Sequence, residues 1–315
     1  MATITEPSQA PALWDLAQGE WRKPDGRATL LGLLGGLILL GLIYATNLRH
    51  FVYAWTTDDN YSHGFLVPFI SLYFANRAAL RGPVEVRSGV LLGLALLGVS
   101  IVGRLGTVLV PVPFLGDLTF LLGIAGVCAL VAGTAALRRY WFAIFFLIFM
   151  VPLPIALYTQ IASPLQFGVS RVASDVLNLT GLPVLREGNR MTLPGGTQMF
   201  VAEACSGMRQ LTGFIALTAA VAYLSARPSW YRVALVASAI PIAMTANTAR
   251  VVLTGYIMHY NPAYASGTFH TIEGLLMMGL GLSLLRGEGW ILDQVVQILE
   301  RPEEPATGLR VAGAR

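Results

Sequence analysis

Repeated apolar runs of about 20 residues are the feature that most constrains this 315-residue chain. A helix needs about 20 mostly apolar residues to cross a bilayer, and short polar gaps separate the runs. Only 12% of the residues are charged, against roughly a quarter in a soluble domain. We therefore predict an all-α polytopic membrane protein. Its expected transmembrane helices, about eight in all, are residues 28–46, 64–80, 88–110, 115–136, 140–158, 206–225, 233–252 and 269–286.

The positive charges predict the orientation, because loops rich in Lys and Arg stay in the cytoplasm. They flank alternate loops, which puts both termini in the cytoplasm: residues 1–27 as an N-terminal segment, 28–286 as the transmembrane domain and 287–315 as a tail that begins with a short surface helix. The charges that set this pattern are Arg22, Lys23, Arg27, Arg77, Arg81, Arg87, Arg138, Arg139, Arg227, Arg232 and Arg286, with Arg49 as an exception. The net charge of +4 forms no basic patch, so nucleic acid is not an expected partner.

The long loop 159–204 is predicted to be an extracytoplasmic insertion with its own structure. Residues 160–180 place apolar residues at helical spacing, which is typical of an amphipathic helix on the membrane surface. Two turn signals follow between short β-prone pieces, Glu187-Gly188-Asn189 and Pro194-Gly195-Gly196. We expect a small hairpin or three-stranded ribbon that leads the chain directly to Cys205.

Cys205 begins a predicted transmembrane helix, and Arg209 follows one helical turn later on the same face. A thiol at a helix N-terminus beside a guanidinium is favoured as a thiolate nucleophile. The alternative is a buried apolar cysteine with a snorkelling arginine, and the residues alone favour neither. Cys128 has only apolar neighbours in the sequence and is expected to be inert.

Ionisable residues at membrane depth are functional candidates, and three further groups lie at the predicted outer face. Arg250 is either a functional group or an interfacial anchor. His270 is either a general acid–base or an ordinary interfacial histidine. The polar residues that precede the second transmembrane helix either bind substrate or cap a helix. The three groups are Asn247 with Arg250, His270 with Glu273, and Asp58, Asp59, Tyr61 and His63.

A thiol, a guanidinium and an imidazole at one membrane face suit acyl transfer. The thiolate attacks a carbonyl, the guanidinium stabilises the oxyanion, and the imidazole moves protons. Two histidines and one thiol without tight spacing make a weak metal site, so we expect neither a metal nor a cofactor.

Six segments resemble the exosortase/archaeosortase family of polytopic membrane transpeptidases, and they are most similar to the bacterial exosortases. The segments are NYSHGFLVP (60–68), FMVPLP (149–154), REGNRMTLP (186–194), VAEACSGMRQL (201–211), IPIAMTANTARV (240–251) and FHTIEG (269–274). They occur in the family's order. The resemblance implies that Cys205, Arg250 and His270 form the catalytic set.

The resemblance also implies a role in protein sorting. Such an enzyme is a thiol protease and transpeptidase that recognises a C-terminal signal of the PEP-CTERM type: a short motif such as Pro-Glu-Pro, a transmembrane helix and a basic tail. It cleaves near the motif on the periplasmic face of the inner membrane, through a thioester, and passes the new carboxyl end to an acceptor in bacteria that make exopolysaccharide. Expected partners are these secreted proteins, an unidentified acceptor and membrane lipids. Expected substrate-binding or supporting residues are Arg209, Glu203, Asn247, His63, Tyr61 and Glu273.

Two other classes of protein compete with this interpretation. A transporter of a polysaccharide or lipid intermediate would carry polar residues near the middle of its transmembrane helices, whereas here they gather at one face. A non-enzymatic scaffold of exopolysaccharide assembly would tolerate substitutions at Cys205.

Overall fold

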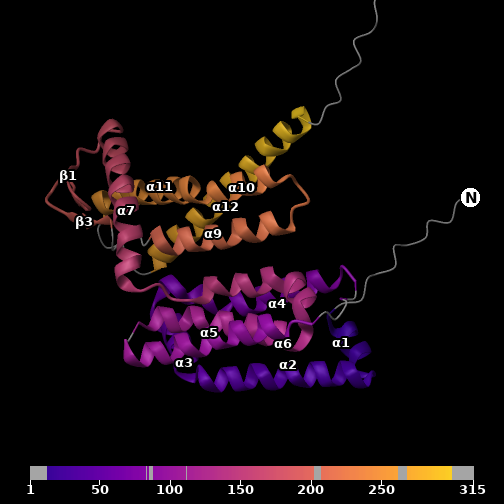
Figure 1. Ribbon diagram of the computed structural model, residues 1–315. Helices are drawn as coiled ribbons and strands as arrows, with labels where there is room; N and C mark the ends of the chain where they lie inside the picture. The colour runs from indigo at the N-terminus through magenta and orange to yellow at the C-terminus, as the bar shows by residue number, and fades with distance from the viewer. Residues whose placement is uncertain are drawn as a thin grey trace, which may run out of the picture. The chain divides into compact units, whose positions relative to one another are not determined.

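The computed structural model describes residues 13–82, 84, 88–110, 112–201, 207–261 and 268–299. Helices make up almost all of this part of the chain, together with one small sheet (Figure 1). Within the described residues, five helical segments are long and apolar enough to cross a membrane: Pro24–Ile43, Val90–Thr107, Phe114–Met150, Ser229–Tyr260 and Gly274–Leu299. The predicted class, an all-α polytopic membrane protein, is confirmed. The chain divides into two compact units, residues 1–164 and 165–315.

Unit 1 is helical throughout its described residues. Its elements are α1 (Leu13–Trp21), α2 (Pro24–Ile43), α3 (Ala45–Thr57), the 3₁₀ helix η1 (Asp59–Phe65), α4 (Val67–Ala79), α5 (Val90–Leu109), α6 (Pro113–Phe146), the 3₁₀ helix η2 (Leu147–Met150) and the first residues of α7 (Ile155–Leu179). Helices α5 and α6 pack closely because Gly93 faces α6: a Cβ at this position would lie 2.5 Å from the backbone nitrogen of Leu130. A larger residue at position 93 would force these two helices apart.

Two helices were predicted at 115–136 and 140–158, but the structure places the break between them elsewhere. The break falls inside α6 at Gly133, whose φ of 87° and ψ of 171° are not helical. Arg138 and Arg139, expected in a loop, therefore lie on the helical stretch that follows Gly133. The Arg139 guanidinium donates to the carbonyl oxygens of Ala78 and Gly82 at 3.2 and 3.3 Å. These bonds join α6 to the end of α4. They also give hydrogen-bond partners to the Arg139 guanidinium, which the sequence predicted to lie in a loop.

Unit 2 contains most of the predicted insertion and the last helices. Its elements are the remainder of α7, the strands β1 (Leu185–Glu187), β2 (Arg190–Thr192) and β3 (Gln198–Phe200), and the helices α9 (Gly207–Leu224), α10 (Ser229–Ala237), α11 (Ala239–Tyr260) and α12 (Thr268–Leu299). The strands form an antiparallel sheet in the order β1-β2-β3. Gly188, Gly195 and Gly196 have φ of 64°, 87° and 82° in its two turns, a backbone region that glycine enters without strain. The helix and three-stranded ribbon predicted for this segment are confirmed.

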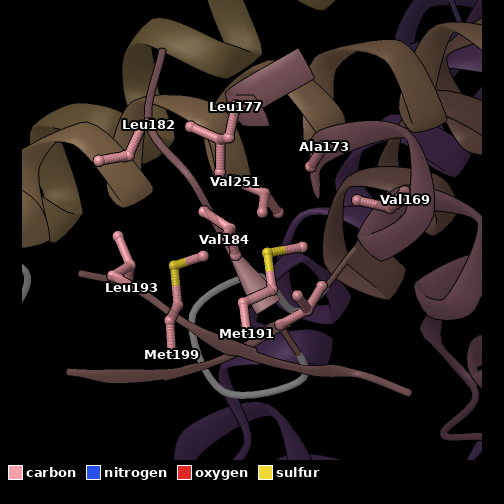
Figure 2. Close-up of a cluster of buried hydrophobic side chains, with 10 residues drawn as sticks. Val169, Ala173, Leu177, Leu182, Val184, Met191, Leu193, Met199 and Val251 are labelled. Atoms are coloured by element: carbon pink, nitrogen blue, oxygen red, sulfur yellow. The ribbon is translucent and has the colours of Figure 1, made fainter. Parts of the chain in front are cut away.

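One hydrophobic cluster holds the sheet in place (Figure 2). Its members come from α7, from the segment leading into β1, from the sheet and from α11. They are Val169, Ala173, Leu177, Leu182, Val184, Met191, Leu193, Met199, Val201 and Val251. Met191 and Met199 face each other across β2 and β3. The insertion thus has its own core, and that core is completed by Val251 of the membrane helix α11.

Helix α12 extends beyond the predicted transmembrane helix. It continues without a break from Thr268 to Leu299, so the surface helix expected at the start of the tail is instead the last part of α12. Two polar contacts fasten this part to its neighbours: Asp293 pairs with Arg227 at 2.9 Å, and the Ser238 hydroxyl donates to Glu288. Both contacts join α12 to residues of the α9–α10 region, although a partly exposed ion pair of this kind adds little stability.

Candidate functional site

Helix α11 carries a row of polar side chains that are buried. Asn247 is 3% exposed, Arg250 8% and Thr254 2%. Positions 247, 250 and 254 lie on one face of a helix because they are separated by three and four residues. Arginine and asparagine inside a membrane protein are costly and usually serve a function. This face is therefore the candidate site that the structure describes.

The insertion is packed directly against this face. Val251, next to Arg250, is fully buried in the cluster that supports the sheet (Figure 2). Helix α7 approaches α11 closely at two points: a Cβ on Gly255 would lie 3.0 Å from Leu177 Cδ1, and a Cβ on Gly168 would lie 3.2 Å from Met244 Cε. The position of Arg250 therefore depends on the packing of α7 and the sheet.

The Asn247 amide adds hydrogen-bonding capacity to the face. Its Oδ1 atom is buried and has no hydrogen-bond partner among the described residues. A buried amide oxygen without a donor costs free energy, so this atom is an acceptor with unused capacity. Together, Asn247 and Arg250 present an acceptor and a cationic donor one helical turn apart. This combination suits the binding of a peptide group whose carbonyl oxygen gains negative charge.

Five predicted site residues, or their side chains, lie outside the part of the chain that the structure describes. Cys205 and Glu203 fall in the undescribed segment 202–206, between the end of β3 and the start of α9. Arg209 lies in the first turn of α9, and His270 and Glu273 lie in the first two turns of α12. The roles assigned to these five residues remain predictions.

Backbone connectivity brings the relevant helix ends to one end of unit 2. Helix α11 packs against both α9 and α12. Only seven residues join the end of α11 at Tyr260 to the start of α12 at Thr268, so α12 begins near the end of α11. Six residues separate Phe200, the end of β3, from the start of α9 at Gly207, and the sheet rests on α11 through Val251. Helices α9, α11 and α12, which follow Cys205, carry Arg250 and carry His270 in the sequence, thus pack together in unit 2.

Tyr61 and His63 belong to unit 1, where they bind the segment that contains the FMVPLP motif. The Tyr61 hydroxyl accepts from the Leu153 N–H at 3.2 Å and donates to the Leu153 carbonyl at 3.4 Å. His63 Nε2 lies 3.2 Å from the Phe149 carbonyl oxygen, and the Trp55 indole donates to the Met150 carbonyl at 2.9 Å. Burial raises the pKa of Tyr61 above its ordinary value, so the phenol stays protonated at neutral pH. Two of the sequence motifs therefore form one structural element; their predicted contact with substrate remains a prediction.

A buried carboxylate in unit 1 was missed by the sequence reasoning. Asp117 on α6 is 0% exposed, and its Oδ1 accepts from Asn47 Nδ2 at 2.7 Å. His50 Nδ1 lies 3.7 Å from its Oδ2. The signal was present, because Asp117 is an acid inside a predicted apolar run. Its partners, however, lie about 70 residues earlier in the chain.

Few metal-ligating side chains lie close together in the part of the chain that the structure describes. No group of three or more His, Cys, Asp or Glu side chains lies close enough there to hold a metal ion. Cys128 is a free, half-buried thiol.

Comparison with known families gives one match. A family model described as transmembrane exosortase matches residues 55–287. No match was found among curated proteins or among solved structures. The matched range contains all six sequence segments quoted above, and together with the apolar helices it identifies a multi-pass membrane protein with a transpeptidase-type role.

Proposed function

The chain belongs to the transmembrane exosortase family, and we propose that it is a cysteine transpeptidase that removes C-terminal sorting signals from secreted proteins. The signal would consist of a short motif of the Pro-Glu-Pro type, a transmembrane helix and a basic tail. The released protein would pass to an acceptor nucleophile, in a cell that makes exopolysaccharide.

The proposed chemistry is acyl transfer through a thioester. The Cys205 thiolate attacks the carbonyl carbon of the scissile peptide bond, forming a carbon–sulfur bond. The carbon–nitrogen bond then breaks, and the leaving amine takes a proton from His270. In the second step an acceptor nucleophile gives its proton to His270 and attacks the thioester, which frees the thiolate. Arg250 stabilises the oxyanion that forms in each step.

The observation that carries this proposal is the buried arginine. Arg250 is 8% exposed on a membrane helix, it ends the NTAR segment, and it lies in the matched range. An interfacial anchor would extend its guanidinium to water, whereas a guanidinium held inside the protein has a fixed direction. Preorganised donors in a water-poor site stabilise a developing oxyanion more strongly than donors in water do.

The three-stranded sheet is the proposed docking element for the sorting motif. Strand β3 ends five residues before Cys205, so a motif bound along the sheet would be close to the nucleophile. The exposed residues of β1, Leu185, Arg186 and Glu187, offer polar and apolar contacts at a sheet edge. Arg209 and Glu203 would then orient the thiol or bind the motif's own charged residue.

We place the active site on the periplasmic face of the inner membrane, with both termini in the cytoplasm. The support is the distribution of Lys and Arg, which gathers on alternate loops. On this topology the residues 202–206 and the start of α12 face the compartment into which secreted proteins emerge.

A cleavage assay in cells tests the proposal. The full-length enzyme is co-expressed with a tagged secreted protein that carries a matching C-terminal signal from the same genome, and cleavage is followed by the loss of the tail. Cys205→Ala is expected to abolish cleavage, while Cys128→Ala is expected to leave the rate unchanged, because Cys128 is half-buried among apolar residues. Normal cleavage by Cys205→Ala, with the variant present at wild-type abundance, would rule out the thioester mechanism.

A further inference from the structure

Unit 1 contains a cavity that the proposed reaction does not use. Its volume is about 570 Å³, within the range of roughly 300–1,000 Å³ that is typical of small-molecule sites. The cavity lies where α1 meets α2, beside the end of α4 and the middle of α6. Its lining consists of Leu16, Glu20, Lys23, Asp25, Gly26, Thr29, Leu30, Leu33, Gly82, Val84, Ala132, Ala136 and Tyr140.

The lining is polar at one end and apolar at the other. Glu20, Lys23 and Asp25 lie at the junction of α1 and α2, whereas Leu30 and Leu33 lie one to two turns further along α2. Ala132 and Ala136 of α6 continue the apolar part. Small side chains at these two positions leave the space that the cavity occupies. An amphipathic molecule would match this gradient, with its charged end at the helix junction.

The tryptophans near the polar end are of the kind expected at the depth of the lipid headgroups. Helix α1 exposes two tryptophans, Trp14 at 71% and Trp21 at 49%, and exposed tryptophans gather at the boundary between lipid and water. The Leu13 N–H donates to the Asn76 side chain at 2.7 Å, which fastens α1 to α4. The apolar run of α2 begins immediately beyond this junction. The cavity therefore spans the boundary between headgroups and acyl chains.

The charges at the polar end fit a group that is both cationic and anionic. Lys23 Nζ pairs with Glu20 Oε1 at 2.7 Å, whereas the Asp25 carboxylate has no polar partner among the described residues. Gly26 keeps Glu20 close, since a Cβ there would lie 2.2 Å from the Glu20 carbonyl oxygen. The lining carries one lysine and two carboxylates, so a ligand with only negative charge would be disfavoured. A phosphate could bind Lys23 if an ammonium group on the same molecule binds Asp25.

We propose that this cavity binds a zwitterionic phospholipid that carries a primary amine. Lys23 receives the phosphate, Asp25 and Glu20 receive the ammonium group, and Leu30, Leu33, Ala132 and Ala136 contact the start of the acyl chains. A primary ammonium group donates hydrogen bonds to carboxylates, which a quaternary ammonium group cannot do. The site therefore selects phosphatidylethanolamine over phosphatidylcholine, and over the anionic phosphatidylglycerol.

Native mass spectrometry of the full-length protein in detergent micelles tests this assignment. Dioleoyl forms of the three lipids are added in equal amounts, and the retained adducts are compared. We expect phosphatidylethanolamine to be retained about tenfold more than either competitor, because charge-assisted hydrogen bonds are the distinguishing contacts. Asp25→Asn is expected to remove most of this preference. Asp15→Asn, the same change at an acid of α1 that does not line the cavity, is expected to keep it.

A second variant distinguishes a built cavity from a charged surface. Ala132→Leu adds bulk inside the apolar part and is expected to reduce retention of all three lipids while leaving the charges intact. Equal retention of the three lipids by the wild type would overturn the proposal. So would tightest binding of phosphatidylglycerol, or an unchanged preference in Asp25→Asn. Because Asp25 is exposed, its variant should fold normally, and its result stands even if Ala132→Leu fails to fold.

Discussion

Arg250 directly precedes Val251 on α11, and Val251 is fully buried in the cluster that supports the three-stranded sheet. The buried arginine and the docking point of the insertion are therefore neighbours on one helix. We expect a change that loosens the sheet to alter the position of the guanidinium as well. This relationship links the stability of the insertion to the proposed chemistry.

Replacing Arg250 by lysine should distinguish the contribution of its positive charge to catalysis from that of its hydrogen-bond geometry. Lysine keeps the positive charge but lacks the planar fork of donors. We expect Arg250→Lys to lower the cleavage rate by roughly 100-fold, as the loss of an oxyanion donor does, with normal abundance in the membrane. Arg171→Lys, an exposed arginine on α7, is the matched control and should cleave normally. A near-normal rate for Arg250→Lys would show that no directed hydrogen bond from this side chain is needed.

Met191→Ala should destabilise the insertion. Met191 is 0% exposed in the cluster beneath the sheet, and truncating a buried methionine to alanine costs about 2–5 kcal/mol. The thermal unfolding midpoint in detergent should fall, and cleavage should fall with it. Val172→Ala removes apolar atoms from a position that is 49% exposed and should change neither. If Met191→Ala lowered the midpoint without affecting cleavage, the sheet would not be coupled to the site.

Tyr61→Phe should loosen the contact between the two motifs of unit 1. The Leu153 N–H would lose the hydroxyl that it donates to, at a cost of about 1–3 kcal/mol if the group stays buried. Tyr53→Phe, at a position 67% exposed, is the control.

The stabilising effect of Tyr61 should also depend on pH. Burial raises the pKa of Tyr61 in the folded protein, so its contribution is fully present below about pH 10, the ordinary tyrosine value, and is lost as pH rises through the folded value. A thermal midpoint that does not differ between wild type and Tyr61→Phe at pH 7 would contradict this role.

Asn47→Ala should destabilise unit 1 by leaving Asp117 Oδ1 without its donor. The bond is 2.7 Å long and both residues are buried, so we expect a loss of about 1–3 kcal/mol. The double variant Asn47→Ala with Asp117→Leu should be less destabilised than the sum of the two single variants, because it removes both members of the pair. Additive thermal shifts would show that the two side chains do not interact.

Patterns of neighbouring residues in the sequence were enough to predict much of the fold. The apolar run at 28–46 became α2, and the glycines at 188, 195 and 196 marked the two turns of the sheet. These features depend on neighbouring residues, so one sequence was enough. The match of six segments to one family gave the proposed roles of Cys205, Arg250 and His270, which composition and spacing had left open.

Contacts between distant residues could not be predicted in this way. Tyr61 meets Leu153 across 92 residues of chain, and Asn47 meets Asp117 across 70. The charges of Arg138 and Arg139 indicated a loop, but the break lies at Gly133, and Arg139 on the helical stretch after it binds the carbonyl oxygens of Ala78 and Gly82. Tertiary hydrogen bonds satisfied polar groups that the pattern had assigned to water.

Trapping the acyl-enzyme tests the central claim most directly. The full-length protein in detergent is mixed with a synthetic peptide that carries the cognate motif, quenched in acid within the first turnover and digested for mass spectrometry. We predict that the peptide containing Cys205 gains the mass of the acyl fragment, that hydroxylamine removes it, and that the adduct is absent in Cys205→Ala. Cleavage of the peptide with no adduct on Cys205, or with an adduct on another residue, would contradict the account.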